Sequence, residues 1–597
     1  MSTLERSTEY YGLTDLFDQL YESSLNGETF RELYQFIVLK QNILLAYRNI
    51  KRNSGSKTPG VDGITISDIE RLNENDFVEI IRANLSNYRP GPVRRVYIPK
   101  KNGKKRPLGI PNLYDRIIQQ TIKQVIEPIV EAKFFKHSYG FRPLRSVEQA
   151  MGRMHSVINN VQLHYVVDVD IKGFFDNVNH NLLRHQIWNM GIRDTKLIAI
   201  ISKILRAEIV GEGTPVKGTP QGGVLSPLLA NIVLNDLDQW IASQWENFPS
   251  KHRYSRGKLH RALKGTTLKE GYLVRYADDF KLLTRSYSMA KRWYTAIRGY
   301  IEKHLKLEIS PEKSGITNLR KKRTEFLGFE IRAVPKGNKY TARSYVSRTS
   351  KQTMIKQLRE TIKRIQGNPG YVHLLNYKIL GMHNYYRIAT TVSVAFSEID
   401  YELKQMMKTR FKTVGKYSKP YHGTSLTFDK LYSKTYRTWR INGTWIYPIA
   451  DVQFKIPINF IPGTVPYTSS GRNKYYKGIG IDIKIEMAKI LRRRETGRTV
   501  EYMNNRLSRY VMVNGKCEVT GRVLSSEEFH CHHITPVSMG GTDRYDNLKI
   551  IHKAVHKIIH ANTINNSLKY LIELQLTDKQ LDKINILRTK CHLEPIK

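Results

Sequence analysis

Two neighbouring carboxylates are the residues of this chain that point most directly to chemistry. Asp278 and Asp279 follow Tyr276 and Ala277 and lie between two β-prone runs, residues 272–275 and 280–283. Adjacent acids at a tight turn repel each other, and divalent cations that bind between them and a polyphosphate relieve that repulsion. The pattern therefore predicts a β-hairpin whose turn holds metal for nucleotidyl transfer. An acidic surface turn is the alternative.

A second acidic strand supplies a further ligand. In the segment from Tyr165 to Asp170, alternation places Asp168 and Asp170 on one face of a strand and Val167 and Val169 on the other. Two-metal chemistry needs carboxylates from adjacent strands, because one metal lowers the pKa of the attacking hydroxyl while the other binds the triphosphate. We predict that Asp170, Asp278 and Asp279 are catalytic and bind two Mg²⁺ ions.

A cluster of histidines near the C-terminus forms a second constellation. It consists of His530, Cys531, His532 and His533, then Asn547, and finally His556 and His560. His556 and His560 are four positions apart, so on a helix they project from one face as metal ligands must. With His532 they predict a site for one divalent ion, Mg²⁺ or another, and His530 remains the alternative to His532. Two helical histidines alone are more typical of an exposed or core pair.

The composition of the chain indicates which class of partner it binds and how many domains it forms. Lys and Arg total 97 against 53 Asp and Glu, a formal net charge of +44, which favours binding to nucleic acids. With 597 residues and 40% apolar content, the chain predicts three or four domains. The sequence contains no apolar stretch of membrane-helix length and no signal-peptide core, and its three cysteines are few, so we expect a cytoplasmic protein without disulfides.

The sequence also resembles a known family, and ordered motifs carry the resemblance. Besides the segments around Asp170 and Asp278 they are residues 54–63, 94–100, 106–111, 138–143, 218–227, 311–314 and 326–329. In this order they resemble the reverse transcriptases encoded by group II introns, with maturase and HNH endonuclease regions. The resemblance implies a multidomain α+β protein with a right-hand polymerase. Its parts would be fingers and palm (residues 1–335), a helical thumb or maturase domain (336–415), a basic DNA-binding region (416–500) and a ββα-metal HNH domain (501–597).

Local patterns suit the polymerase part. Helical spacing is present in the first 50 residues, and residues 114–126 predict an amphipathic helix that ends or kinks at Pro128. An Asn-Gly pair within residues 101–105 predicts a hairpin between strands 96–99 and 106–110. By resemblance, Lys100 and Arg106 at its ends contact the incoming triphosphate.

The glycine-rich segment from Gly218 to Gly223 precedes a predicted helix and brings backbone close to a ligand. The resemblance implies that Gln221 contacts the template base pair or the incoming nucleotide, whereas a structural turn is the alternative. It also implies that Phe175 excludes a ribose 2′-hydroxyl and so selects deoxynucleotides. Phe174 competes for this role, because strand parity places it on the face of Asp170.

Basic and aromatic segments follow. Residues 353–365 predict an amphipathic helix with a cationic face. Residues 380–386 resemble a maturase thumb signature, although a helix packing its aromatics into a core is an equal alternative. Between 410 and 500, aromatic residues alternate with cations, which suits single-stranded nucleic acid or, equally, a small basic core; they are Tyr417, Tyr421, Tyr432, Tyr436, Trp439 and Trp445.

In the HNH region, the resemblance implies that His533 activates water and that Asn547 fixes the backbone that supports this histidine. HNH domains of this class often carry Cys-x-x-Cys zinc pairs, but the segment from Cys517 to Thr520 has one thiol. A structural Zn²⁺ is therefore not expected, and zinc binding by Cys517 or Cys531 stays open.

Together these features predict a multifunctional protein. It would copy RNA into DNA from deoxynucleoside triphosphates, bind its intron RNA and aid splicing, and nick target DNA for target-primed reverse transcription. We expect a cytoplasmic, nucleoid-associated ribonucleoprotein with no membrane partner, whose dimerisation stays open. The alternatives are a reverse transcriptase repurposed for defence or another host role, and a binding-only splicing factor.

Overall fold

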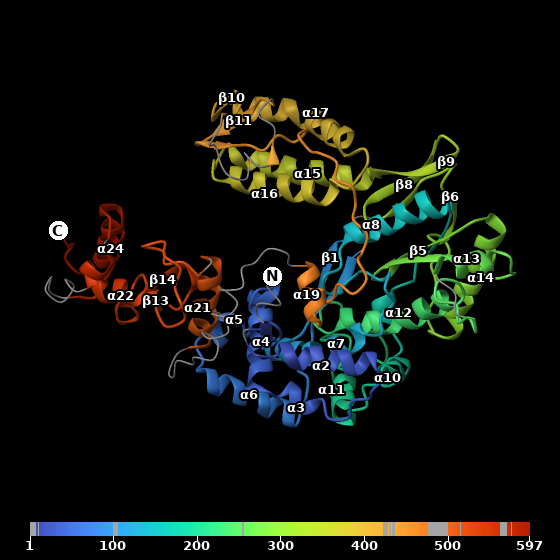
Figure 1. The fold of residues 1–597 in the computed structure, drawn as a ribbon, viewed down its shortest axis with the longest axis horizontal. Helices are drawn as coiled ribbons and strands as arrows, with labels where there is room; N and C mark the ends of the chain where they lie inside the picture. The colour runs from blue at the N-terminus through green and yellow to red at the C-terminus, as the bar shows by residue number, and fades with distance from the viewer. Residues whose placement is uncertain are drawn as a thin grey trace. The chain divides into compact units, whose positions relative to one another are not determined.

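The computed structural model describes residues 8–9, 11–99, 105–252, 256–421, 428, 431–432, 436–475, 499–513, 515–561, 570–574 and 576–596 (Figure 1). The chain forms two compact units. Unit 1 comprises residues 1–133, 175–232 and 463–597, and unit 2 comprises residues 134–174 and 233–462. Among the helices of the described residues, none is long and apolar enough to cross a lipid bilayer.

The first part of unit 1 is mainly helical. Its N-terminal helix α2 (Thr14–Leu25) buries Phe17, Leu20 and Tyr21, as the helical spacing predicts. The central helix α7 (Leu113–Glu131) passes through Pro128, so the predicted end at this proline is wrong. Pro128 lies in the last turn, and its carbonyl accepts a hydrogen bond from the amide of Ala132, which continues the helix.

The remaining elements of this part are α3 (Tyr34–Ile37), α4 (Lys40–Lys51), η1 (Ser54–Lys57), α5 (Ile66–Ile69), α6 (Glu74–Ser86), α10 (His180–Asn189), α11 (Thr195–Leu205) and α19 (Ser469–Tyr475). Two helices have residues in both units, α9 (Phe174–Asn177) and α12 (Ser226–Ser243).

A two-stranded arm lies within unit 1. Strands β1 (Arg94–Pro99) and β2 (Lys105–Ile110) pair antiparallel, with Ile98 opposite Arg106, which confirms the predicted strands. Residues 100–104 that join them lie outside the described residues, and so does the predicted triphosphate contact Lys100.

Unit 2 is built on an antiparallel sheet with the order β4-β5-β3-β6. The strands are β3 (Tyr165–Val169), β4 (Tyr272–Tyr276), β5 (Asp279–Thr284) and β6 (Gly315–Asn318). Helices α8 (Val147–Ser156) and α14 (Tyr287–Lys303) contact this sheet, the π-helical turn η2 (Val157–Val161) extends α8, and α13 (Arg256–Lys264) precedes β4. The β4–β5 pair is the hairpin that the sequence predicts around Asp278.

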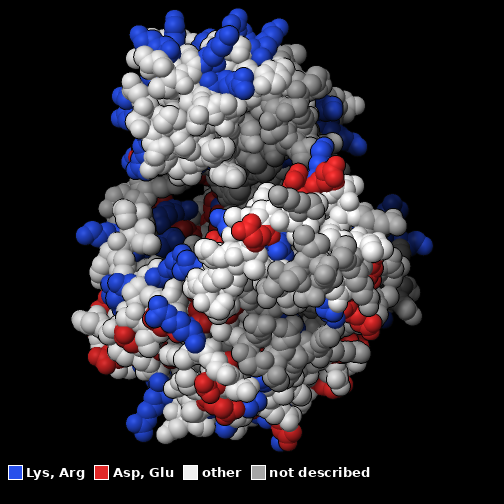
Figure 2. Space-filling view, turned by 90° about the vertical axis from the view of Figure 1, so that its left-hand side faces the viewer, with Lys and Arg blue, Asp and Glu red and all other residues white. Residues whose placement is uncertain are grey.

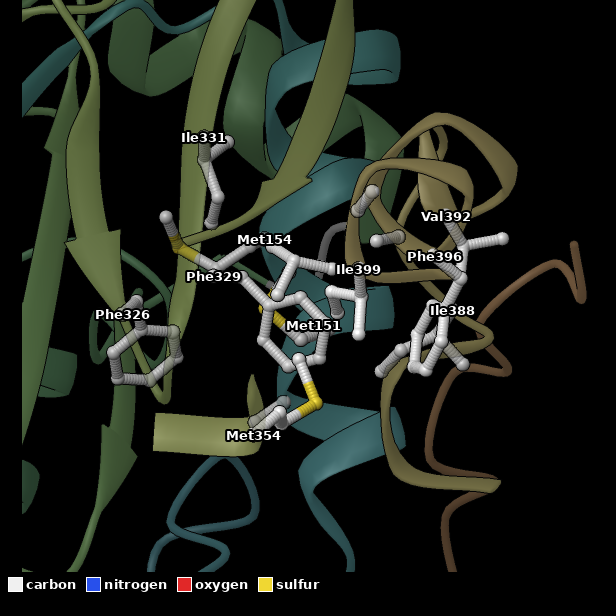
Figure 3. Close-up of a cluster of buried hydrophobic side chains, with 14 of the residues drawn as sticks. Met151, Met154, Phe326, Phe329, Ile331, Met354, Ile388, Val392, Phe396 and Ile399 are labelled. Atoms are coloured by element: carbon white, nitrogen blue, oxygen red, sulfur yellow. The ribbon is translucent and has the colours of Figure 1, made fainter. Parts of the chain in front are cut away.

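A three-stranded antiparallel sheet and a helical bundle complete unit 2 (Figure 1). The strands are β7 (Thr324–Phe326), β8 (Phe329–Lys336) and β9 (Lys339–Val346), and the helices are α15 (Arg348–Ile365), α16 (Tyr371–Tyr386) and α17 (Val392–Phe411). Figure 3 shows Phe329 of β8 beside Met354 of α15 and Ile399 of α17, within one continuous buried cluster. The bundle is followed by a small sheet of β10 (Gly415–Ser418), β11 (Thr438–Ile441) and β12 (Thr444–Trp445).

The C-terminal part of unit 1 has its own apolar core. Helix α21 (Val500–Met512) precedes an antiparallel pair, β13 (Phe529–His533) and β14 (Leu548–His552), and helices α22 (Lys553–Ile559) and α24 (Asp578–Lys590) follow. Short turns η3 (Val537–Met539) and η4 (Tyr545–Asn547) lie in the loop between the strands. The sequence of two strands and a helix agrees with the predicted ββα arrangement of the histidine region.

Candidate active sites

The sheet of unit 2 brings the predicted catalytic carboxylates to one end. Strand β3 ends at Val169, which pairs with Phe280 of the antiparallel strand β5. Continuing this register by one position places Asp170 across from Asp279, and Asp278 is the next residue, in the turn of the β4–β5 hairpin. The three side chains thus belong to one sheet edge, and we call Asp170, Asp278 and Asp279 the carboxylate site.

A buried ion pair fixes the turn of this hairpin. Ala277 has a φ of 57°, a conformation that costs a residue with a Cβ atom some strain. Its carbonyl accepts a hydrogen bond of 2.8 Å from the guanidinium of Arg275, which also pairs with Asp238 at 2.6 Å. A Cβ atom on Gly140 would lie 2.3 Å from the backbone nitrogen of Ala277, so only glycine allows this segment to pack on the turn. The sequence gives no local sign of the contact between Arg275 and Asp238, because the two residues are far apart in the chain.

Two lysines neutralise the acidic edge. Lys281 is buried and its Nζ lies 2.7 Å from Asp168 and 3.1 Å from Asp279. Burial opposes its charge, but Asp279 and Asp168 together raise the pKa of Lys281 above its usual value, so it stays protonated. The exposed Lys313 lies 3.1 Å from Asp170. Hard carboxylate oxygens at one edge suit Mg²⁺, and the carboxylates of Asp170 and Asp279 remain 41% and 42% exposed.

The predicted nucleotide contacts belong to unit 1. Phe174 is 3% exposed and lies in the core, whereas Phe175 is half-buried, which favours Phe175 as the residue available to a ligand. The side-chain amide of Gln221 donates a hydrogen bond of 3.2 Å to the carboxylate of Asp176. The backbone carbonyl of Gln221 accepts a hydrogen bond of 2.7 Å from the backbone amide of Gly109 in β2. Arg106 is exposed on β2.

A cavity of about 430 Å³ lies beside these residues of unit 1. Its walls include Arg95, Tyr97, Asp176 and Pro220, and this volume falls in the range of small-ligand sites. Gly222 in the nearby turn is needed for packing within the protein, because a Cβ atom at this position would lie 2.4 Å from the carbonyl oxygen of Gly109. The turn therefore packs tightly on β2, as the structural alternative for this segment supposes.

The aromatic residues after α17 divide into two groups. Tyr432 and Trp445 are buried with Phe428 in a small core. Tyr417, Tyr421 and Tyr436 are exposed, and arginines lie over two of these rings: Arg437 over Tyr417 at 5.3 Å and Arg440 over Tyr421 at 5.6 Å. The core alternative thus applies to Tyr432 and Trp445, and for the exposed tyrosines binding to single-stranded nucleic acid stays a prediction.

Two tyrosines of the exposed group, Tyr417 and Tyr436, border a cavity of about 760 Å³ within unit 2. Lys404, Lys408 and Arg437 supply positive charge to its walls, and Tyr417 and Trp439 supply aromatic faces. Figure 2 shows Lys and Arg side chains gathered on the upper part of the face in view. Positive charge beside aromatic rings suits single-stranded nucleic acid.

The predicted thumb signature lies at the end of α16. His383 is buried, with one ring nitrogen 2.9 Å from the carbonyl of Ile449 and the other 3.2 Å from the hydroxyl of Tyr432. Burial is the main reason that the pKa of His383 falls to about 4, so the imidazole is neutral. This histidine joins α16 to the segment after β12, which supports the packing alternative for that position.

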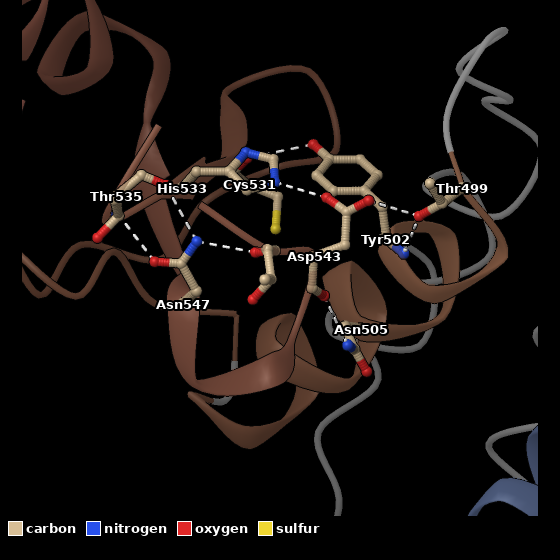
Figure 4. A network of polar contacts seen from close by, with 9 residues as sticks. Thr499, Tyr502, Asn505, Cys531, His533, Thr535, Asp543 and Asn547 are labelled. Carbon is tan, nitrogen blue, oxygen red and sulfur yellow. Dashed lines mark hydrogen bonds and ion pairs between the residues drawn. The ribbon is translucent and has the colours of Figure 1, made fainter. Parts of the chain in front are cut away.

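In the C-terminal part, His533 is held by a carboxylate that the sequence analysis missed. Its Nε2 lies 2.7 Å from Asp543, in the loop between β13 and β14, and its ring stacks on Tyr502 at 5.4 Å (Figure 4). The backbone carbonyl of Asp543 accepts from Asn505 at 2.8 Å, and its side chain also accepts from the hydroxyl of Thr499. An imidazole oriented by a carboxylate through one nitrogen presents the other to water, as a general base requires.

Asn547 fixes the backbone next to this histidine. Its side-chain oxygen accepts from the amide of Thr535 at 2.9 Å, and its side-chain nitrogen donates to the carbonyls of Thr535 and Thr542 at 3.0 and 2.8 Å (Figure 4). Thr535 lies two residues after His533. These contacts agree with the supporting role that the sequence analysis predicts for Asn547.

The histidines predicted to bind metal lie together beside these residues. The rings of His532 and His560 are 5.3 Å apart, and those of His556 and His560 are 4.6 Å apart. His532 is 1% exposed, and its Nε2 has no hydrogen-bond partner among the residues that the structure describes. A buried imidazole nitrogen in this state fits a metal ligand.

Electrostatics keep these rings in the form that binds metal. Burial first, and then the neighbouring imidazoles, lower the pKa of His532 and of His556 to about 3. Both side chains are therefore neutral at pH 7, as metal ligands must be. The ring of His530 lies 3.8 Å from that of His556, in a tilted arrangement. The sulfur of Cys517 accepts the amides of Thr520 and His552, both at 3.4 Å.

Two regions of the chain match known protein families. Residues 98–331 match the family described as reverse transcriptase (RNA-dependent DNA polymerase), and residues 516–562 match HNH endonuclease. Protein YkfC of Escherichia coli is 34% identical over 311 residues, which are 48% of this chain and 80% of that protein. Group II intron-encoded protein LtrA of Lactococcus lactis is 32% identical over 348 residues, 51% of this chain and 57% of LtrA.

One relative aligns with most of both chains. The putative COX1/OXI3 intron 1 protein of Saccharomyces cerevisiae is 25% identical over 579 residues, 82% of this chain and 68% of its own length. The carboxylate site falls in the reverse transcriptase match and the histidine cluster in the HNH match. The chain therefore belongs to the group II intron-encoded reverse transcriptases and maturases that carry an HNH endonuclease domain.

Proposed function

We propose that the chain is a retrohoming protein that polymerises DNA on an RNA template, assists splicing of its intron RNA and nicks target DNA. The observation that carries this proposal is the presence of two separate sites in two matched domains, three carboxylates on one sheet edge and a carboxylate-held histidine beside a histidine cluster. The four parts proposed are residues 1–335, 336–415, 416–500 and 501–597.

For polymerisation, we propose that Asp170, Asp278 and Asp279 hold two Mg²⁺ ions. When bound, the ions supply stabilisation of the charge that develops on the attacking and leaving oxygens. Arg275 and Asp238 hold the turn, and Lys281 keeps the carboxylates together before substrate arrives. Lys100 and Arg106 are proposed to contact the triphosphate, Gln221 the base pair, and Phe175 the sugar.

For nicking, we propose that His533 takes a proton from water, which then attacks the phosphodiester. Asp543 orients the imidazole, and Asn547 holds the loop that carries it. His532, His556 and His560 are the residues proposed for the divalent ion, which supplies stabilisation of the leaving oxygen when bound. The neutral state of the buried rings supports this assignment.

For RNA and DNA binding, the basic bundle α15–α17 and the cation-lined cavity beside α17 support contacts to phosphates and unstacked bases. We propose that α15–α17 bind the intron RNA and that residues 416–500 contact DNA. The complex would be a cytoplasmic ribonucleoprotein associated with the nucleoid.

The intron partnership is tested by crosslinking the protein expressed from its native locus and sequencing the RNA that it retains. The proposal predicts one folded transcript that encloses or flanks the reading frame. Diverse cellular RNA, or an unrelated small RNA, would contradict the partnership and favour a reverse transcriptase repurposed for another host role. A deoxynucleotide incorporation assay separates either enzyme from a binding-only splicing factor.

A further inference from the structure

The histidine cluster has a sulfur neighbour that the sequence motifs do not indicate. Ligand atoms of His532, His560 and Cys591 all lie within 4.8 Å of one another. Cys591 follows α24, 31 residues after His560, and is 4% exposed. His532 belongs to the same group, and its buried Nε2 has no hydrogen-bond partner among the described residues. An imidazole nitrogen that could bind a metal ion therefore lies close to a thiol that could bind the same ion.

The fold holds this cysteine against the cluster rather than leaving it at a loose end of the chain. The guanidinium of Arg588, one turn before Cys591, donates to the carbonyls of Ile558 and Ala561 at 2.7 and 2.9 Å. These two carbonyls flank His560. Arg588 is 5% exposed, and its Nε donates to the carbonyl of Glu594 at 2.7 Å, beyond the cysteine. One buried side chain therefore ties both sides of Cys591 to both sides of His560.

We propose that Cys591 is a metal ligand of the HNH domain, which together with His532 and His560 binds a borderline-soft ion of the Zn²⁺ class. This inference rests on the proposed HNH metal site and deepens it. Two imidazoles and a thiolate prefer Zn²⁺ or Co²⁺ to Mg²⁺, since a soft sulfur ligand disfavours a hard cation. Binding converts the thiol to the thiolate and releases its proton to solvent. On this inference Cys591 takes the place that the proposed function gives to His556, whose ring lies 3.8 Å from that of His530.

The proposal has a spectroscopic test that does not depend on nicking. The full-length protein, stripped of metal by a chelator, is titrated with Co²⁺ in excess Mg²⁺, which occupies the carboxylate site. A thiolate ligand gives a sulfur-to-cobalt charge-transfer band in the near ultraviolet, in addition to the visible bands of tetrahedral cobalt. We expect that band to saturate at one Co²⁺ per chain and to disappear when Zn²⁺ is added.

Substitutions assign the sulfur. Cys591→Ser should abolish the charge-transfer band, and Cys591→His, which keeps a donor atom without sulfur, should retain cobalt binding but not the band. Cys517→Ser and Cys531→Ser are matched controls, because both thiols are buried in the same domain, and they should keep the band. Loss of Cys591 should weaken Co²⁺ binding by at least the roughly tenfold that loss of a supporting partner causes.

The outcomes separate the inference from the function on which it rests. Visible tetrahedral bands without charge transfer in the unsubstituted protein would overturn Cys591 as a ligand and leave the histidine site standing. A band that survives Cys591→Ser but not Cys517→Ser would also overturn it. Absence of saturable cobalt binding would contradict the proposed metal site itself. Because the unsubstituted protein carries the main readout, a variant that fails to fold does not block the test.

Discussion

The two sites proposed for this protein would act on the same kind of bond, a phosphodiester that one forms and the other cleaves, with different electrostatics. The carboxylate site consists of partly exposed acids that pair with Lys281 and Lys313. The histidine site consists of neutral imidazoles, of which His532 is almost fully buried. If both proposals hold, the first arrangement leaves ligand atoms open for metal that enters with a triphosphate, whereas the second holds its metal ligands together before substrate binds. We therefore expect substrate to complete the carboxylate site and protein packing to complete the histidine site.

The strongest test of the carboxylate side is Asp279→Asn. This substitution removes one charge but keeps the side-chain shape, so primer extension should fall at least about 10³-fold, or about 4 kcal/mol of transition-state stabilisation. Single-turnover extension of a primer on an RNA template measures the loss. DNA nicking by the same preparation is the control and should be unchanged. Extension within tenfold of the unsubstituted protein would contradict the assignment of Asp279.

The next effect concerns the ion pair that holds the hairpin turn. Arg275 and Asp238 are 1% and 0% exposed, so Arg275→Met leaves a buried carboxylate without its partner and should lower the free energy of unfolding by about 3–5 kcal/mol. Urea titration measures this change. Arg298→Met is the matched control, because its pair with Glu302 lies at the surface and its loss should leave the free energy of unfolding nearly unchanged. Equal shifts for both variants would disprove the structural role.

On the histidine side, Asn547→Ala removes three hydrogen bonds to the backbone around Thr535 and Thr542. Since the loop that supports His533 loses these contacts, nicking should fall about 10²-fold. The rate at which the protein nicks a supercoiled plasmid measures this loss. Asn585→Ala on α24, which removes a side-chain amide that binds the backbone of Ile596, is the control and should nick normally. Similar losses in both variants would indicate general destabilisation instead.

A smaller effect is expected for Asp543→Asn. The amide keeps a polar contact to His533 but loses the charge that favours the imidazolium formed when water gives up its proton. The rate of nicking at saturating DNA should fall about tenfold while KM for DNA stays constant. Asp543→Glu should recover part of the rate. A change confined to KM would point to a DNA contact rather than to a positioning residue.

The sequence predicts features that depend on local residue patterns, such as strands and hairpins. It does not predict contacts between residues that are far apart in the chain. Alternation along residues 165–170 and the hairpin around Asp278 follow from local pattern, so the sequence alone predicts that the three carboxylates lie at one sheet edge, while their catalytic role stays a prediction. Asp543 lies in a loop that Asn547 holds, Arg275 needs a partner 37 positions earlier, and tertiary contacts such as those of Arg588 bring Cys591 to the cluster. Pro128 lies inside α7 although local propensity disfavours it there, because the residues of this helix, Pro128 among them, are buried by tertiary packing.

The central claim, two independent sites in one chain, is tested most directly by measuring both reactions on two variants side by side. Asp278→Ala should abolish primer extension and leave nicking and RNA binding intact, whereas His533→Ala should abolish nicking and leave extension intact. That reciprocal loss is the result the account predicts. Full extension by Asp278→Ala, retained nicking by His533→Ala, or loss of both reactions in either folded variant would contradict it.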